Sequence, residues 1–228
     1  MKIVISCMDR RLNEYLDSLN DGETIFLRNA GANLNGLKTT LNVLLNNENI
    51  TEIKVITHTD CGAMKTVSKA LNKEIELSPL ANEVLVNLFK DLKSATPSEL
   101  EEENTRIQKE LLEEIANARG FKASVEMFDL SKVKFKDKGE HIFTLLEPSN
   151  MKYEKIIGKE GLFEHYIIQS ASLEEKYVDM EIAINVLGVK KGEIVALDTS
   201  EYRKIELYAS RLKINPLLKD IELTKRRI

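Results

Sequence analysis

Tryptophan is absent from this 228-residue sequence, and cysteine, histidine and proline are rare, with two, three and four residues. Scarce proline and glycine, together with a hydrophobic content of 43%, exclude a disordered or fibrous chain. No apolar run reaches the roughly 18 residues that a membrane-spanning helix needs. The formal net charge is −4, and the basic residues form no stripe, which argues against nucleic-acid binding. We therefore expect partners other than nucleic acids and membranes.

We do not expect the first residues of the sequence to form a signal peptide. The segment MKIVIS already alternates like a β-strand, and no small-residue cleavage site follows it. We therefore expect a cytoplasmic protein. Thiols stay reduced in that compartment, so the two cysteines are expected to bind a metal or to react, and not to form a disulfide.

Short apolar runs alternate with amphipathic stretches, which is typical of an α/β fold with a mostly parallel central sheet flanked by helices. The expected strands cover residues 2–6, 24–28, 53–57, 123–130, 141–146, 166–170 and 193–197. The expected helices cover residues 10–19, 35–47, 63 onward, 79–117, 151–158, 173–187 and 201–213. Pro97 should break the long helix, with Ser98 as the N-cap of its second part. The final segment LTKRRI is expected to be a solvated tail.

Both cysteines and one of the histidines directly follow predicted strands. Cys7 follows strand 2–6, and His58 and Cys61 follow strand 53–57. The carboxyl ends of neighbouring parallel strands meet at one edge of a sheet, so these three side chains should converge. Two thiolates and one imidazole suit Zn²⁺, and three protein ligands leave a fourth position open, as in catalytic zinc sites. A buried cysteine or a core histidine is the ordinary interpretation of each residue alone, but their joint placement favours zinc.

Asp9 and Arg11 share a loop with Cys7, and two arrangements are open for them. Asp9 could be a further metal ligand, or it could pair with Arg11 and accept a hydrogen bond from a metal-bound water. Zinc lowers the pKa of bound water to about 7, so a zinc-bound hydroxide would be available as a nucleophile. The ordinary alternative is an exposed ion pair of little energetic consequence.

The order of these motifs resembles the β-class carbonic anhydrases. CMDRR (7–11) is similar to the Cys-x-Asp-x-Arg motif of that family, and HTDCG (58–62) to its His-x-x-Cys motif. RNAGA (28–32) lies between them, as in the family, and ENTRIQKELL (103–112) resembles a later helix. The resemblance covers roughly residues 1–135.

This resemblance implies a cofactor, a reaction and a set of roles. Cys7, His58 and Cys61 would be zinc ligands, and Asp9 and Arg11 the catalytic pair. The implied activity is that of a carbonate dehydratase, a zinc lyase that reversibly hydrates CO₂ to bicarbonate. The implied small-molecule partners are CO₂ and bicarbonate.

Residues from 141 onward repeat the apolar pattern of the first part. YIIQSAS (166–172) resembles IFLRNAGA (25–32), and residues 183–212 resemble residues 40–71 with short gaps. We therefore predict an internal repeat, with a zinc-binding domain at 1–140 and a truncated, degenerate copy at 141–228. In this alignment the places of Cys7, His58 and Cys61 are taken by Leu146, Asp198 and Glu201.

The family usually places helices before its first strand and forms dimers that complete each other's active sites. Here the first strand begins at residue 2, and a second half follows. We hypothesise that this half replaces the partner subunit, so that the protein is a monomeric pseudo-dimer or a homo-oligomer of such chains.

Three other functions compete with CO₂ hydration. The same scaffold could hydrolyse carbonyl sulfide or carbon disulfide, because the same nucleophile attacks the carbon of each gas. The degenerate second half is also compatible with a non-catalytic zinc-binding protein, although retention of Asp9 and Arg11 argues against it. A thiol redox protein ranks last, since the cysteines form no Cys-x-x-Cys pair.

The remaining polar residues receive ordinary interpretations. Asp60 is expected to cap the helix that follows it. His141 and His165 have no companions at ligand spacing and are expected to be structural or exposed. A hard-metal site formed by Glu147, Asp198 and Glu201 in the second half is not expected, because Pro148 and Leu146 replace the donors of the first loop.

Overall fold

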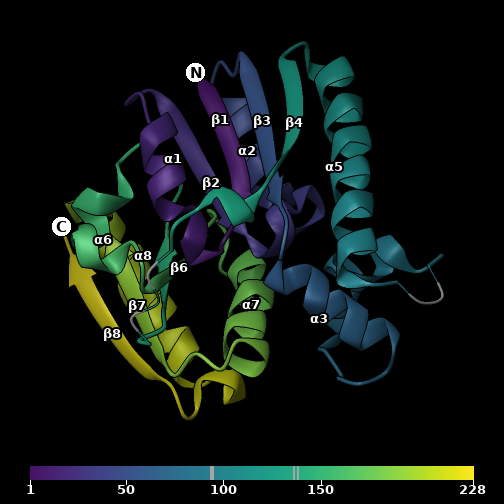
Figure 1. The fold of residues 1–228 in the computed structure, drawn as a ribbon. Helices are drawn as coiled ribbons and strands as arrows, with labels where there is room; N and C mark the ends of the chain where they lie inside the picture. The colour runs from purple at the N-terminus through teal and green to yellow at the C-terminus, as the bar shows by residue number, and fades with distance from the viewer. Residues whose placement is uncertain (93–94, 136, 138) are drawn as a thin grey trace.

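The structure is a computed structural model that describes residues 1–92, 95–135, 137 and 139–228. Its sheet has the strand order β4-β3-β1-β2-β6-β5-β7-β8 (Figure 1). The strands are β1 (Lys2–Cys7), β2 (Thr24–Asn29), β3 (Glu52–His58), β4 (Lys122–Phe128), β5 (Ile142–Leu146), β6 (His165–Gln169), β7 (Lys191–Ala196) and β8 (Glu222–Arg227). Neighbouring strands are parallel except β2 and β6, which are antiparallel and meet at the pair Arg28 and Gln169. The predicted α/β fold is confirmed.

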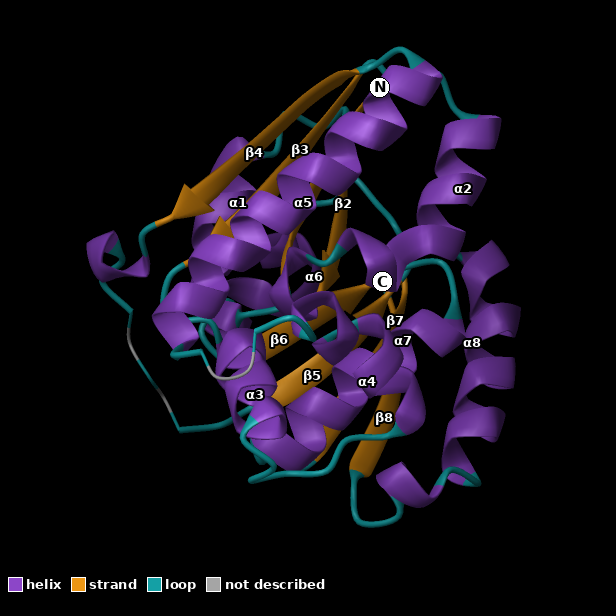
Figure 2. Ribbon diagram, turned by 90° about the vertical axis from the view of Figure 1, so that its right-hand side faces the viewer, coloured by secondary structure: helices purple, strands orange, loops and turns teal. Residues whose placement is uncertain are grey.

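Helices cover both faces of this sheet. They are α1 (Asn13–Leu19), α2 (Lys38–Asn47), α3 (Gly62–Leu71), α4 (Pro79–Val84), α5 (Pro97–Arg119), α6 (Tyr153–Gly161), α7 (Leu173–Glu181) and α8 (Thr199–Lys213). In the N-terminal part of the sheet, α2 and α5 lie over one face and α1 over the other (Figure 2). Across the junction of the two parts, α6 packs beside α1.

Strand β1 is buried on both faces, which explains its nearly continuous apolar sequence. Ile3 and Ile5 belong to the core beneath α2 and α5, with Leu112 of α5. Val4 points the other way and belongs to the core that contains Leu16 of α1. Side chains alternate between the two faces along a strand. The packing of Ile3, Val4 and Ile5 therefore fixes the face towards which each later side chain of β1 points.

The long helix expected over residues 79–117 is interrupted earlier than predicted. Helix α4 ends at Val84, a short 3₁₀ turn follows (Val86–Phe89), and α5 begins only at Pro97. Ser78 caps α4 by accepting a hydrogen bond from the backbone N–H of Ala81. Pro97 therefore opens a helix at its first position, where its missing N–H costs nothing.

The N-cap of α5 is Thr96, and the prediction of Ser98 was wrong. The Thr96 hydroxyl accepts the Glu99 N–H at 3.3 Å, and a Glu99 carboxylate oxygen accepts the Thr96 N–H at 2.7 Å. Ser98 also has a glutamate three residues later, but Ser98 lies inside the helix and that residue, Glu101, accepts the N–H of Cys61 instead.

The C-terminal segment is an edge strand, and its interpretation as a solvated tail was also wrong. Strand β8 pairs along its length with β7. Arg226 forms a two-point ion pair with Glu193 of β7, at 2.7 and 3.1 Å. Charged side chains are common on edge strands, where they discourage pairing with another chain.

Over the described residues, no helix is both long enough and apolar enough to cross a membrane.

Candidate metal centre

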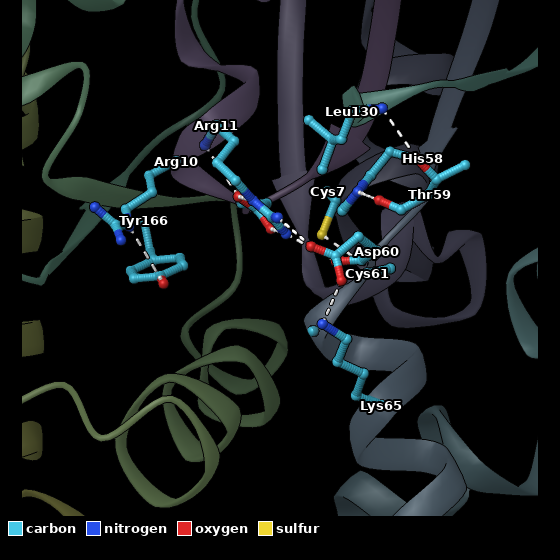
Figure 3. Close-up of polar contacts among 12 residues, drawn as sticks. Cys7, Arg10, Arg11, His58, Thr59, Asp60, Cys61, Lys65, Leu130 and Tyr166 are labelled. Carbon is cyan, nitrogen blue, oxygen red and sulfur yellow. Dashed lines mark hydrogen bonds and ion pairs between the residues drawn. The ribbon is translucent and has the colours of Figure 1, made fainter. Parts of the chain in front are cut away.

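Three potential metal donors meet where β1 and β3 end. Cys7 is the last residue of β1, His58 is the last residue of β3, and Cys61 directly precedes α3. The two strands are neighbours in the sheet, so their carboxyl ends lie together. The donor atoms all lie within 4.8 Å of one another, and the two sulfur atoms are 4.0 Å apart (Figure 3). The side chains of these three residues converge, as the strand ends predicted.

His58 is held in one orientation by the backbone. Its Nδ1 lies 2.8 Å from the carbonyl oxygen of Thr59, so Nδ1 carries the proton and donates it there. Its Nε2 is buried and, among the described residues, has no hydrogen-bond partner. A buried ring nitrogen without a partner is costly, and a metal ion at this point would bind it.

The pKa values of the two thiols are shifted in opposite directions. A hydrogen bond from Cys61 holds the pKa of Cys7 well below its usual range, and the nearby His58 acts in the same direction. Burial lowers the pKa of His58, but the charge of the Cys7 thiolate outweighs it and raises that pKa to about 9. The same hydrogen bond and burial raise the pKa of Cys61. A metal ion would therefore displace protons from this site as it binds.

Backbone and side-chain groups hold the cysteines in place. The N–H of Gly31 points at the Cys7 sulfur at 3.4 Å, and the N–H of Cys61 donates to a carboxylate oxygen of Glu101 at 2.8 Å. Gly31 has a φ of 74°, and an added Cβ would lie 3.1 Å from the Met64 methyl group. Glycine at this position thus permits both the left-handed backbone and the close approach.

Asp9 and Arg11 lie beside the three donors and are bound to each other. Arg11 Nε donates to Asp9 Oδ1 at 3.0 Å, and Arg11 Nη2 donates to Asp9 Oδ2 at 2.7 Å. Burial raises the pKa of Asp9, but the hydrogen bonds and charge of Arg11 outweigh it and hold that pKa below its usual range. The sequence left two arrangements of Asp9 open. In this structure the Asp9 carboxylate is paired with Arg11, and Asp9 is not among the three clustered donors.

The sequence model of the carbonic anhydrase family matches residues 2–134. The chain belongs to the β-carbonic anhydrase family. A search of the solved structures found the β-carbonic anhydrase CafA of the fungal pathogen Aspergillus fumigatus, with a TM-score of 0.40 and 17% identity. That match covers 57% of this chain and 71% of CafA. A search of the curated proteins found no match.

In this member of the β-carbonic anhydrases, Asp60 does not cap the helix, contrary to prediction. The N-cap of α3 is Cys61. Asp60 adopts a φ of 57° and turns its carboxylate towards Arg11 and Lys65 (Figure 3). Its carbonyl oxygen also accepts a hydrogen bond from Arg11 Nη2 at 2.7 Å. Asp60 therefore fixes the far side of the guanidinium that holds Asp9.

Arg28, which the sequence analysis singled out only within RNAGA, holds the first loop from below. It is fully buried, and its Nε donates to the carbonyl oxygen of Cys7 at 2.9 Å. Its Nη2 donates to the carbonyl oxygen of Asp9 at 2.7 Å. One side chain thus positions the backbone of both residues, and its charge compensates the nearby thiolate and carboxylate.

The C-terminal part supplies a residue that sequence reasoning missed. Asp179 of α7 accepts the N–H of Ala30 at 2.7 Å, directly before the glycine that contacts Cys7. Burial raises the pKa of Asp179 well above its usual range. No sequence motif marks it, because its contact depends on the packing of α7 against the loop after β2.

A pocket of about 380 Å³ opens over the site. Residues of the first part that line it include Cys7, Asp9 and Arg11, and the second part contributes Tyr166 and Leu187. The edge with the three donors is therefore bordered by both parts of the chain.

Arg10 joins the two parts next to this pocket. Its Nη1 donates to the carbonyl oxygen of Phe163 at 2.6 Å, and its Nη2 pairs with Asp137 at 2.9 Å. Its guanidinium also lies 5.6 Å from the ring centre of Tyr166 (Figure 3). These contacts fix the position of the second part relative to the first loop.

The other histidines lie outside the cluster, as predicted. His165 is buried and shares a hydrogen bond of 2.6 Å with the Thr144 hydroxyl. His141 is 3.6 Å from Asp137 and partly exposed.

Proposed function

We propose that this protein is a zinc-dependent carbonic anhydrase that reversibly hydrates CO₂ to bicarbonate. The observation that carries the proposal is the convergence of Cys7, His58 and Cys61 next to an Asp9 carboxylate fixed by Arg11. Family membership supports the reaction class.

The donor set fits zinc. Two sulfur atoms and one imidazole nitrogen match a common tetrahedral zinc set with one open position, and the partnerless Nε2 of His58 supports binding of an ion there. When bound, Zn²⁺ supplies the Lewis acidity that makes hydroxide available near neutral pH. In this proposal Cys7, His58 and Cys61 hold the ion, and Asp9 stays with Arg11.

Asp9 has the role of orienting the nucleophile. Each carboxylate oxygen can accept more than one hydrogen bond, so Asp9 keeps acceptor capacity after Arg11 has bound it. Its lowered pKa keeps it ionised, and an ionised carboxylate can only accept. If the proton of the attacking hydroxyl pointed at Asp9, a lone pair on the hydroxyl oxygen would face the substrate.

The pocket lining suits a small neutral substrate and an anionic product. Leu187, Tyr166 and Met8 provide apolar walls, as CO₂ requires. Arg10 and Arg11 place positive charge at the same pocket, which favours bicarbonate.

Stopped-flow CO₂ hydration of the zinc-loaded protein tests this function. Cys61→Ser serves as the metal-site blank, and Asp9→Asn as a variant that should retain zinc but lose most of the rate. We expect a rate well above the blank for the unaltered chain, with Asp9→Asn lower by about 10²-fold or more. An unaltered protein that binds zinc but matches the blank would contradict the proposal. Turnover of carbonyl sulfide and carbon disulfide in parallel would then show whether a different gas is the substrate.

A further inference from the structure

The strand order of the sheet is the same when read outwards from its centre in either direction. From the β2–β6 contact it runs β2-β1-β3-β4 on one side and β6-β5-β7-β8 on the other. The single antiparallel pair, Arg28 with Gln169, stands at the centre. Two copies of one unit related by a two-fold axis would produce this order and this junction, and the axis makes Arg28 and Gln169 equivalent.

The register of the sheet then assigns the equivalent of Cys7. Arg28 lies opposite Ser6 in the first part, and Gln169 lies opposite Leu146 in the second. Leu146 is therefore equivalent to Ser6, and the next residue, Glu147, is equivalent to Cys7. The sequence alignment that put Leu146 in the place of Cys7 was wrong by one residue.

Hydrogen bonds support this register independently. Arg28 Nε donates to the carbonyl oxygen of Cys7 at 2.9 Å, and Gln169 Nε2 donates to the carbonyl oxygen of Glu147 at 3.0 Å. In both parts, a backbone N–H of the loop beyond these residues donates to a side chain of the other part. The N–H of Ala30 donates to Asp179, and that of Ala171 donates to the Thr40 hydroxyl, both at 2.7 Å.

The other two ligand positions follow from β3 and β7. Ser6 lies opposite Ile56, and the β5–β7 register places Leu146 opposite Val195. Counting along both strands makes Leu197 equivalent to His58.

The same count makes Ser200 equivalent to Cys61. The sequence alignment had placed Asp198 and Glu201 at these two positions, and both were wrong by one residue. Asp198 instead caps α8, and Glu201 accepts the backbone N–H of Leu197 at 2.8 Å.

Two ammonium groups stand against the residue at the first ligand position. Lys176 Nζ lies 3.1 Å from one carboxylate oxygen of Glu147, and its side chain is only 1% exposed. Lys204 binds the other oxygen. Lys176 also donates to the carbonyl oxygen of Ser170, and Lys204 donates to that of Ala171 at 3.1 Å. The ammonium of Lys176 is thus buried, with a carboxylate oxygen of Glu147 and the carbonyl oxygen of Ser170 as its neighbours.

We propose that the C-terminal part holds the remnant of a second metal site, in which Glu147 occupies the first ligand position and the Lys176 ammonium replaces the metal ion. Like charges in a buried environment repel strongly, so the buried Lys176 ammonium excludes a divalent cation from this point. The chain then binds one metal ion, at the first site. This inference concerns metal binding and does not depend on which gas the first site converts.

Rebuilding the ligand set tests the proposal. The variant Glu147→Cys/Leu197→His/Ser200→Cys/Lys176→Met restores two thiols and an imidazole at the equivalent positions and removes the ammonium. The matched control, Leu146→Cys/Asp198→His/Glu201→Cys/Lys176→Met, follows the rejected alignment. Bound zinc per chain would be measured by mass spectrometry of metals after gel filtration. We expect two ions in the first variant and one in the control and in the unaltered chain. A folded first variant with one ion would overturn the proposal.

A milder variant covers the case in which the fourfold variant does not fold. Lys176→Ala leaves an ammonium-sized space beside Glu147. We expect ammonium or methylammonium chloride to raise its melting temperature more than sodium chloride of equal ionic strength does. The unaltered protein should not distinguish these salts. An equal response of Lys176→Ala to all three salts would contradict a cation site at this position.

Discussion

The contact of Asp9 with Arg11 determines how Asp9 can act at the candidate metal centre. Asp9 is only 7% exposed. It lies in the loop that begins with Cys7, and nothing in the sequence distinguishes a metal ligand there from a bound partner of Arg11. Arg11 contacts both carboxylate oxygens, and Asp60 contacts Arg11 from the other side. Pulling Asp9 to a metal would break two charge-assisted hydrogen bonds and leave a guanidinium with one partner fewer.

The first residue-scale prediction concerns Arg11→Ala. Arg11 lowers the pKa of Asp9, whereas burial raises it, so after removal of Arg11 burial is opposed mainly by the charge of His58. Asp9 then takes up a proton at a higher pH than in the unaltered protein, and its acceptor function is lost from that pH downwards. We expect the acid limb of the pH–rate profile for CO₂ hydration to move to higher pH. Arg11→Lys, which keeps the charge but loses the two-point contact, should shift less, and an unchanged limb in Arg11→Ala would contradict this role.

At the scale of elements, α5 supports the site from a distance. Glu101 of this helix accepts the N–H of Cys61, and the side-chain amide of Asn104 donates to the carbonyl oxygen of Gly31, at 2.8 Å in both cases. These residues lie on one face of the helix, because positions three apart are neighbours on its surface. The start of α5 therefore matters for the stability of the whole N-terminal layer.

The capping box at the start of α5 gives an element-scale prediction. Thr96→Ala removes the hydroxyl that accepts the Glu99 N–H and should lower the free energy of unfolding by about 1 kcal/mol. Ser98→Ala is the matched control, since that exposed residue lies inside the helix and should change stability by less than about 0.5 kcal/mol. Urea unfolding of the metal-loaded proteins measures both. Equal losses in the two variants would show that Thr96 is not the cap.

The sequence predicted the parts of this fold that depend on local pattern. The parallel sheet, the elements of the second part and the meeting of Cys7 with His58 follow from apolar periodicity and from the common edge of strand ends. The cap of α5 was missed because Ser98 and Thr96 are both good caps, and only the position of Pro97 in the helix distinguishes them.

Long-range pairing explains the remaining errors. The internal alignment was shifted by one residue at Glu147 because apolar residues at the strand end match nearly as well in either register, and only hydrogen bonds to the neighbouring strand decide it. Strand β8 was missed because its charged residues resemble a tail until β7 is placed beside it. Asp179 was missed because its contact with Ala30 spans most of the chain.

For the molecule as a whole, the second part behaves as an integral half and not as an appended domain. Buried residues of both parts, such as Phe26 and Tyr153, belong to one core. The two rings contact each other edge to face, with centres 6.0 Å apart. The second part also lines the pocket through Tyr166 and Leu187. We propose that the chain divides near residue 140 into two copies of one unit, and that these contacts take the place of those with a partner subunit.

Metal content tests the central claim most directly. The apoprotein would be loaded with Co²⁺, which reports tetrahedral geometry and thiolate ligands by absorption, and titrated to saturation in parallel with Cys7→Ser and His58→Ala. We predict one equivalent per chain with thiolate-to-metal charge-transfer bands. We also predict weaker bands in Cys7→Ser and strongly reduced affinity in both variants. Saturation without such bands, or a spectrum that neither substitution changes, would contradict the assignment of Cys7, His58 and Cys61 as the metal centre.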